Sequence, residues 1–303
     1  MESMPLVSII MNCYNSDRFL KEAIDSVYAQ TYSNWEIIFW DNASTDNSAA
    51  IAHSYDERVK YHYALKTTPL GEARNLALQE AIGKYIAFLD CDDCYLPEKL
   101  EKQVLLMEEN SYAMCYGSAI TINELGHEVR RVSVKNQSGR LIGELLNHYE
   151  INMQSVLLRR ALLVEDQLNF ATNMKYCPDH NLFMEIASRY PVGVVHDFIV
   201  KYRVLNDSLS KKTVDIAASE VQFTLDKIVK RAPELKQEFT KEFDQAYEKL
   251  YYYEAVAAIY KNDRKQARQE LQSIISSKVE YLLLYILLFL PLSNQTILKI
   301  IGR

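Results

Sequence analysis

The sequence lacks an excess of positive charge. Of its 303 residues, 34 are Lys or Arg and 40 are Asp or Glu, which gives a formal net charge of −6 at pH 7. A protein that grips a nucleic-acid backbone needs a basic face, because much of its affinity comes from neutralising phosphates. The charge balance therefore predicts that nucleic acid is not a partner.

The sequence also lacks the signatures of an exported, disulfide-bonded protein. It holds five cysteines, an odd number, and its first residues show no basic segment followed by an apolar one, as a signal peptide would. We therefore expect reduced thiols and a cytoplasmic location. Cys91 and Cys94 form a C-x-x-C pair, but no second ligand pair completes a zinc site. The aspartates around them would raise the thiol pKa, which disfavours redox chemistry.

Glycine-rich phosphate loops and membrane-spanning runs are missing as well. Neither G-x-G-x-x-G after a strand nor G-x-x-x-x-G-K-[ST] occurs, so phosphate must be held in another way. The apolar run from Tyr281 to Leu292 has twelve residues, whereas about twenty are needed to span a bilayer. Lys299 and Arg303 follow this run. The pattern over residues 279–303 therefore predicts either contact with an anionic membrane surface or a buried docking helix.

The first ninety residues alternate between strand-like and helix-like patterns. Thr68 and Pro69 predict the start of a helix, with the hydroxyl as its cap, that runs to about Ile82. The alternation predicts an α/β fold with a mostly parallel sheet and helices on both faces. A β-rich apolar run predicts a strand at 6–11, a second buried strand follows at 35–40, a third, short one at 59–63 and a fourth at 85–89.

Two acidic clusters follow predicted strands of this sheet. Asp41 comes directly after the second strand and Asp90 directly after the fourth, so both lie at the carboxyl edge, where open α/β sheets bind ligands. Asp90 and Asp92 have the D-x-D spacing, which turns both side chains to one side of an extended segment. Carboxylates at this spacing suit a hard divalent cation that also contacts substrate phosphates. The alternative is an acidic turn ahead of the helix near Pro97.

The pattern changes twice further along the chain. From about residue 111 it is mixed, with short strands, a helix from about Asp179 to Tyr190 and a strand that ends near Arg203. Beyond Ser210 it becomes helical and charge-rich. We therefore expect an α/β domain over residues 1–210 and a helical C-terminal region over residues 211–303.

Four sequence blocks resemble those of family 2 glycosyltransferases, in the same order and at similar spacing. They read VSIIMNCYN at 7–15, DNASTD at 41–46, ARN at 73–75 and FLDCDD at 88–93. One block alone would be weak evidence for the family, but four blocks in order across the first 110 residues are a specific signature. The resemblance implies a GT-A (Rossmann-like) fold, a nucleotide-sugar donor and an inverting transfer to a hydroxyl of a glycan or lipid-linked acceptor in cell-surface polysaccharide synthesis.

The resemblance also implies which residues bind the donor base. In the family, the base pocket uses the backbone at Asn12, the ring at Tyr14 and the acidic pair that is Asp41-Asn42 here. Many relatives carry two aspartates at that pair, and asparagine can still accept a hydrogen bond through its carbonyl oxygen. UDP is therefore the expected nucleotide.

The remaining donor residues follow from the same resemblance. It implies that Arg74 approaches the donor phosphates or sugar, although an arginine of an amphipathic helix is often just exposed. It implies Asp92 as the main ligand of Mg²⁺ or Mn²⁺, with Asp90 near the ribose or sugar and Asp93 sharing the metal. In the family a Y-R-x-H block can add a histidine ligand, and here Leu205 stands at that position.

The general base is expected at the start of a later helix. CPDHNLFME at 177–185 resembles the family's segment with an acid at the first turn, which implies Asp179 as the catalytic base. The alternative is that Asp179 only caps its helix. Two other readings of the whole chain stay open: a nucleotidyltransferase or glycosidase that uses the same carboxylates, and a non-catalytic scaffold, which Pro178 and Leu205 favour. No motif in the sequence identifies the sugar or the oligomeric state.

Overall fold

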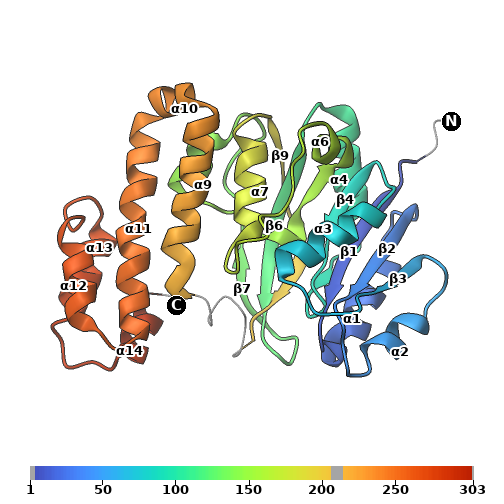
Figure 1. Ribbon diagram of the computed structural model, residues 1–303, viewed down its shortest axis with the longest axis horizontal. Helices are drawn as coiled ribbons and strands as arrows, with labels where there is room; N and C mark the ends of the chain where they lie inside the picture. The colour runs from blue at the N-terminus through green and yellow to red at the C-terminus, as the bar shows by residue number, and fades with distance from the viewer. Residues whose placement is uncertain (1–3, 206–213, 302–303) are drawn as a thin grey trace. The chain divides into compact units, whose positions relative to one another are not determined.

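The computed structural model describes residues 4–205 and 214–301 (Figure 1). The chain divides into two compact units, the first made of Met1–Leu145 and Tyr149–Asn206, the second of Leu146–His148 and Asp207–Arg303. This division lies close to the boundary expected near residue 210. The first unit holds the sheet, and the second unit is helical.

Nine strands of the described residues form one sheet in the order β3-β2-β1-β4-β8-β6-β9-β5, with β7 paired to β6. The first four strands in this order are parallel, as expected, and the second half mixes antiparallel pairs with the parallel pair β6 and β9. The strands are β1 (Val7–Cys13), β2 (Trp35–Asp41), β3 (Val59–Tyr63), β4 (Tyr85–Phe88), β5 (Cys94–Tyr95), β6 (Met114–Ile122), β7 (Glu128–Val132), β8 (Leu157–Arg159) and β9 (Val192–Arg203).

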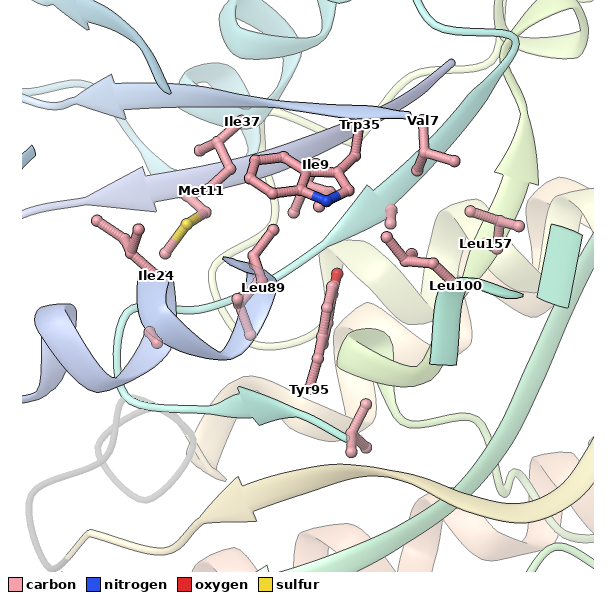
Figure 2. Packing of buried hydrophobic residues seen from close by; sticks show 14 of the residues in the cluster. Val7, Ile9, Met11, Ile24, Trp35, Ile37, Leu89, Tyr95, Leu100 and Leu157 are labelled. Atoms are coloured by element: carbon pink, nitrogen blue, oxygen red, sulfur yellow. The ribbon is translucent and has the colours of Figure 1, made fainter. Parts of the chain in front are cut away.

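Helices cover both faces of the parallel half. Figure 2 shows Val7, Ile9 and Met11 of β1 on the face that Ile24 and Leu100 cover. Alternate strand residues point to opposite faces, so Ser8, Ile10 and Asn12 lie on the other face of β1. The helices of this unit are α1 (Asp17–Tyr28), α2 (Ser48–His53), α3 (Leu70–Glu80), α4 (Lys99–Glu109), α5 (Ile142–Asn147), which continues into the second unit, η1 (Met153–Ser155), α6 (Arg160–Glu165) and α7 (Pro178–Ala187).

The opposite face carries α3 and α7. Ala73 and Ala77 of α3 are buried. Phe88 of β4 meets Phe170 edge-on at 5.5 Å between ring centroids and lies 6.1 Å from Phe183 of α7. Because Phe88 is two residues from Asp90, this packing fixes where the acidic segment leaves the sheet.

The expected start and end of α3 need correction. Pro69 is the N-cap residue, and the Thr68 hydroxyl donates to Asn42 Oδ1 at 3.2 Å instead of capping the helix. The helix ends at Glu80, before Ile82, because Ala81 adopts an extended backbone that leads into β4. Tertiary contacts of Thr68 therefore override its local capping preference.

The second unit has its own apolar core. Ile259, Leu271, Leu284 and Ile297, from four different helices, are all buried in it. No helix among the described residues of the chain is both long and apolar enough to cross a membrane. The elements of this unit are η2 (Val214–Ile216), α9 (Ala217–Arg231), α10 (Pro233–Glu238), α11 (Thr240–Tyr260), α12 (Arg264–Gln272), α13 (Val279–Leu287) and α14 (Asn294–Ile300).

Candidate active site

The carboxyl ends of β1, β2 and β4 meet at one edge of the sheet. Cys13 at the end of β1 is in register with Asp41 at the end of β2. Leu89, just past β4, donates its backbone N–H to the Ile10 carbonyl at 3.0 Å. Since the three strands are parallel, the segments that follow them leave from the same side. The sequence clusters around Tyr14, Asn42 and Asp90 are therefore neighbours in the fold.

Asp41 organises the turn after β2. Its side chain is fully buried, Oδ1 accepts a hydrogen bond from the Ser44 N–H at 2.7 Å, and Oδ2 accepts one from the Tyr61 hydroxyl at 2.7 Å. Ala43 within this turn has a positive φ of 68°, a left-handed backbone that the Asp41 contact stabilises. Asp41 thus shapes the expected base pocket through the backbone that it holds.

Asn42 uses its whole amide to hold the segment before α3. Its Nδ2 donates to the Thr68 carbonyl at 2.8 Å, and its Oδ1 accepts from the Thr68 N–H at 3.1 Å and from the Thr68 hydroxyl at 3.2 Å. An amide oxygen has two lone pairs, and both have partners here. These contacts disfavour the expected hydrogen bond from a base to the Asn42 carbonyl oxygen.

Asn12 and Trp40 present unused donors near this edge. They are register partners on β1 and β2, so their side chains lie on the same face of the sheet. Within the described residues, Asn12 Nδ2 and Trp40 Nε1 are buried and have no hydrogen-bond partner. Buried donors without partners are rare in proteins, and a ligand with acceptor atoms would satisfy them. Tyr14, the last of the expected base-pocket residues, is 53 % exposed.

Asp90 is held from two sides. Its backbone N–H donates to Gln154 Oε1 at 2.8 Å, and Gln154 Nε2 donates back to Asp90 Oδ2 at 2.7 Å. Asp90 Oδ1 lies 3.5 Å from Arg74 Nη2. Arg74 is 5 % exposed and lies over the Phe170 ring, so the alternative of an exposed helix arginine is wrong.

The other two aspartates of the cluster differ in burial. Asp93 is 1 % exposed and its Oδ1 accepts the Arg203 N–H at 2.6 Å, while Asp92 is partly exposed. Burial raises the pKa of Asp93 well above its ordinary value, and the Asp92 and Asp90 carboxylates add to the rise. The contact of Asp93 with β9 favours a structural part for it over the expected share of a metal.

Arg203 at the end of β9 ties the acidic segment to its surroundings. Its Nε donates to the Asp92 carbonyl at 2.8 Å, and its Nη2 pairs with Glu22 of α1 at 2.7 Å. Leu205 is two residues further on, and the rest of the expected block, 206–210, lies outside the described residues. Arg203 therefore holds the backbone on which Asp92 sits.

The donor set of this edge suits a hard cation shared with substrate. No group of three or more His, Cys, Asp or Glu in the described ranges is placed to hold a metal ion by itself. Mg²⁺ and Mn²⁺ bound with nucleotides commonly take one or two carboxylates and complete their shell with phosphate and water. Asp92 fits that pattern, because it is an accessible carboxylate beside Asp90 at the sheet edge.

Asp179 joins this cluster from a distant part of the chain. It lies in the first turn of α7, which opens with Pro178. Burial raises the pKa of the Asp179 carboxyl; the Arg74 guanidinium opposes the rise, and the Asp90 carboxylate adds to it. Phe183 of α7 lies 6.1 Å from Phe88 of β4, which brings the helix that carries Asp179 to the strand that leads to Asp90. A carboxylate with a raised pKa is a stronger base than an ordinary aspartate.

Three site residues were missed from the sequence. Gln154 holds Asp90, Trp40 offers a buried donor, and the Tyr149 ring lies 4.6 Å from that of His180, next to Asp179. The Tyr149 hydroxyl is buried and has no hydrogen-bond partner in the described part of the chain. None of the three belongs to a block of the family pattern. The one local signal for Gln154 is that it is a polar residue within the segment NMQSVLL at 152–158.

Comparison with known proteins places the chain in a family. Residues 8–164 match the sequence model of Glycosyl transferase family 2, and the chain belongs to that family. It is similar to WfgD of Escherichia coli, named as UDP-Glc:alpha-D-GlcNAc-diphosphoundecaprenol beta-1,3-glucosyltransferase, with 33 % identity over 208 residues that cover 68 % of this chain and 79 % of WfgD.

Two further similarities concern length and fold. An uncharacterized glycosyltransferase of Rickettsia felis is 34 % identical over 200 residues, which cover 65 % of this chain and 33 % of that protein. The match thus spans about a third of that relative. The mannosyltransferase PcManGT of Pyrobaculum calidifontis, solved with GDP-Man and Mn²⁺, aligns with a TM-score of 0.63 at 17 % identity over 99 % of this chain and 85 % of its own. This alignment confirms the expected GT-A fold.

Proposed function

We propose that this chain is an inverting glycosyltransferase that moves a sugar from a UDP-sugar to a hydroxyl of a lipid-linked glycan, with its catalytic machinery in residues 1–210. The observation that carries the proposal is the pairing of Arg74 with Asp90 at the carboxyl edge of the sheet, where the helix that opens with Pro178 and Asp179 packs on β4 through Phe183. The similarity to WfgD, named as a UDP-Glc-dependent enzyme with a diphosphoundecaprenol-linked acceptor, supports this donor and acceptor class.

In the proposed reaction Asp179 is the general base. It removes the proton of the acceptor hydroxyl while the oxygen attacks the anomeric carbon, and the bond from that carbon to the UDP oxygen breaks. A single displacement from the opposite side inverts the anomeric configuration. Partial burial supports this part for Asp179, because it increases the affinity of the carboxylate for a proton.

The donor is proposed to lie along the ends of β1, β2 and β4. Asn12 Nδ2 and Trp40 Nε1 donate to acceptor atoms of the nucleotide, and the Tyr14 ring contacts the base. Asp92 would hold Mn²⁺ or Mg²⁺, which neutralises the leaving diphosphate when bound. Arg74 contributes positive charge to the same group, and Asp90 faces the sugar or ribose. Asp93 fixes β9 against this segment.

The biological setting follows from the proposed acceptor. A lipid-linked glycan is anchored in a membrane, so its transferase must act at a membrane surface. We place this reaction at the inner face of the cell membrane, in the synthesis of a surface polysaccharide. The UDP-sugar is a soluble partner, and the lipid-linked glycan is the membrane-bound one.

The deciding experiment is a screen of the full chain against a panel of nucleotide sugars, with Mn²⁺ and without acceptor. We expect slow hydrolysis of one UDP-sugar that stops when the ion is chelated. If no nucleotide sugar is hydrolysed, the chain is a non-catalytic, nucleotide-sugar-binding or scaffold protein of the same fold. Cleavage of a glycan without any nucleotide would identify a glycosidase instead.

A further inference from the structure

The second unit exposes a continuous apolar stripe. Six residues of α13 and the turn after it are between 42 % and 72 % exposed: Val279, Leu282, Leu283, Ile286, Phe289 and Leu290. At about 100° per residue the four positions within α13 fall within an arc of roughly 100° on one side of the helix, and Phe289 and Leu290 follow in the turn. A single exposed leucine is common on protein surfaces, but a stripe of six neighbouring apolar side chains is not.

The other side of α13 is fixed in the core of the second unit. Tyr281, Leu284 and Leu288 are at most 3 % exposed and pack in the same cluster as Ile259 and Leu271. The apolar run was expected either to touch a membrane or to be buried. The structure shows that one face is buried and that the opposite face is open. The core contacts therefore determine which face of α13 carries the stripe.

Cations stand at both ends of the α13 stripe. At its start, the Lys278 ammonium lies 5.8 Å from the centroid of the Tyr281 ring. At its end, the Arg268 guanidinium lies 4.9 Å from the Phe289 ring centroid, and Arg264 donates to the Leu290 carbonyl at 3.0 Å. Residues 261–303 contain seven Lys or Arg and three Asp or Glu, although the whole chain is net negative. Glu280 is exposed but falls outside the arc of the stripe.

We propose that the α13 stripe docks this protein on an anionic lipid membrane, with Ile286 near its centre. An apolar face flanked by cations is the pattern of helices that lie in the membrane interface, where lipid headgroups meet the cations and acyl chains meet the apolar side chains. A second copy fits less well, because a symmetric contact would set each copy's cations against those of the other. The proposal rests on the proposed function only in that a lipid-linked acceptor also lies in a membrane.

The test is flotation of the full chain with vesicles of phosphatidylcholine that contain about one third phosphatidylglycerol. The wild type is expected to float with them and to stay behind with pure phosphatidylcholine. Ile286→Glu should weaken binding by about tenfold or more, because it removes apolar contact and adds a negative charge. Ile286→Ser should weaken it less. Lys278→Gln should weaken it about fivefold at low salt.

A matched control replaces an equally accessible helix residue elsewhere. Leu105 on α4 in the first unit is 58 % exposed, and Leu105→Glu should leave vesicle binding unchanged. Circular dichroism melting checks that each variant folds. The proposal is overturned if the wild type ignores anionic vesicles, if Ile286→Glu binds them like the wild type, or if Ile286→Glu only converts a dimer to a monomer.

Hydrolysis of UDP-sugar in solution separates this proposal from the catalytic one. Ile286→Glu should hydrolyse donor like the wild type, since Ile286 belongs to the second unit and not to the catalytic cluster. A wild type that binds vesicles but hydrolyses no nucleotide sugar would support docking and refute the proposed activity. A wild type that hydrolyses donor but binds no vesicle would support the proposed activity and refute docking.

Discussion

At the scale of single residues, neighbouring aspartates of one short segment have different surroundings. Asp93 is buried against the backbone of β9, Asp90 is held by Gln154 and Arg74, and Asp92 is partly exposed at the sheet edge. Three identical side chains can therefore have different roles. A metal ligand must be accessible to substrate, whereas a carboxylate that only accepts hydrogen bonds within the fold can be buried. This contrast leads to a prediction about Asp92.

Asp92→Ala is expected to abolish transfer and the metal-dependent part of UDP affinity while the fold survives. The reason is that Asp92 is proposed to hold the ion that bridges the diphosphate. Calorimetry with UDP, with and without Mn²⁺, measures this directly. Glu128→Ala on β7, which removes an exposed partner of Arg131, serves as the control. Unchanged turnover in Asp92→Ala would rule out the metal assignment.

Asp179→Asn is expected to lower turnover by about two to four orders of magnitude, the usual worth of a positioned general base. Donor affinity should change little, because the base faces the acceptor and asparagine keeps the size of the side chain. The measurement is a pair: donor affinity by calorimetry and transfer rate at saturating donor. Asp197→Asn, on an aspartate paired with Lys102 at 2.9 Å, is the control. A parallel loss of affinity and rate would show a structural role.

The raised pKa of Asp179 also fixes the direction of the pH dependence. Only the ionised carboxylate can take a proton, so wild-type turnover should fall as pH drops through the pKa of Asp179. Because burial raises that pKa, the fall should begin at a higher pH than an ordinary aspartate would give. A rate profile that stays flat down to the ordinary range would contradict this.

At the scale of elements, a buried lysine links α4 to the segment that carries Gln154. Lys99 is fully buried; its Nζ donates to Gln103 Oε1 at 2.7 Å and lies over the Tyr95 ring. Gln103 in turn donates to the Ser155 carbonyl at 2.7 Å. Burial lowers the pKa of the Lys99 ammonium to about 7. This network positions η1, and with it the glutamine that holds Asp90.

The network predicts how stability varies with pH. Between about pH 7 and pH 9 the unfolded chain keeps the Lys99 proton while the folded chain loses it, so the free energy of unfolding should rise with pH. Lys99→Met keeps the length of the side chain without the charge and should reduce that rise. Urea denaturation of both proteins at the two pH values gives the comparison. Equal pH slopes in both proteins would show that Lys99 stays charged in the fold.

At the scale of the whole molecule, the proposed catalysis and the proposed membrane contact belong to different units. Each unit has its own buried apolar cluster, one under the sheet and one among the helices of the C-terminal region. A chain of residues 1–206 should therefore unfold cooperatively by itself. Deleting 279–303 alone, by contrast, would remove core residues of the second unit such as Leu284 and Ile297.

Residues 1–206, produced alone, are expected to keep donor hydrolysis and to lose vesicle binding. The reason is that the catalytic cluster lies within these residues and the α13 stripe does not. Melting by circular dichroism, the hydrolysis assay and flotation check the three expectations. Aggregation of this fragment, or the absence of a melting transition, would show that the first unit depends on the second.

The sequence by itself determined the parallel half of the sheet and the acidic edge. Strands such as Tyr85–Phe88 are local apolar runs, and the residues that follow them leave at a known edge. The blocks around Asn12, Asp41, Asp90 and Asp179 could be found because each is contiguous in the chain. These features need no knowledge of distant contacts.

Only the tertiary structure decided what those residues touch. Gln154 is 64 positions from Asp90, and Arg203 is 110 positions from Asp93, so no local pattern records either contact. Asn42 and Thr68 exchange hydrogen bonds that occupy the amide expected to face the base and turn the Thr68 hydroxyl away from helix capping. The two faces of α13 are equally apolar in sequence. Which one is buried depends on where the neighbouring helices pack, because burial is a property of packing and not of the helix alone.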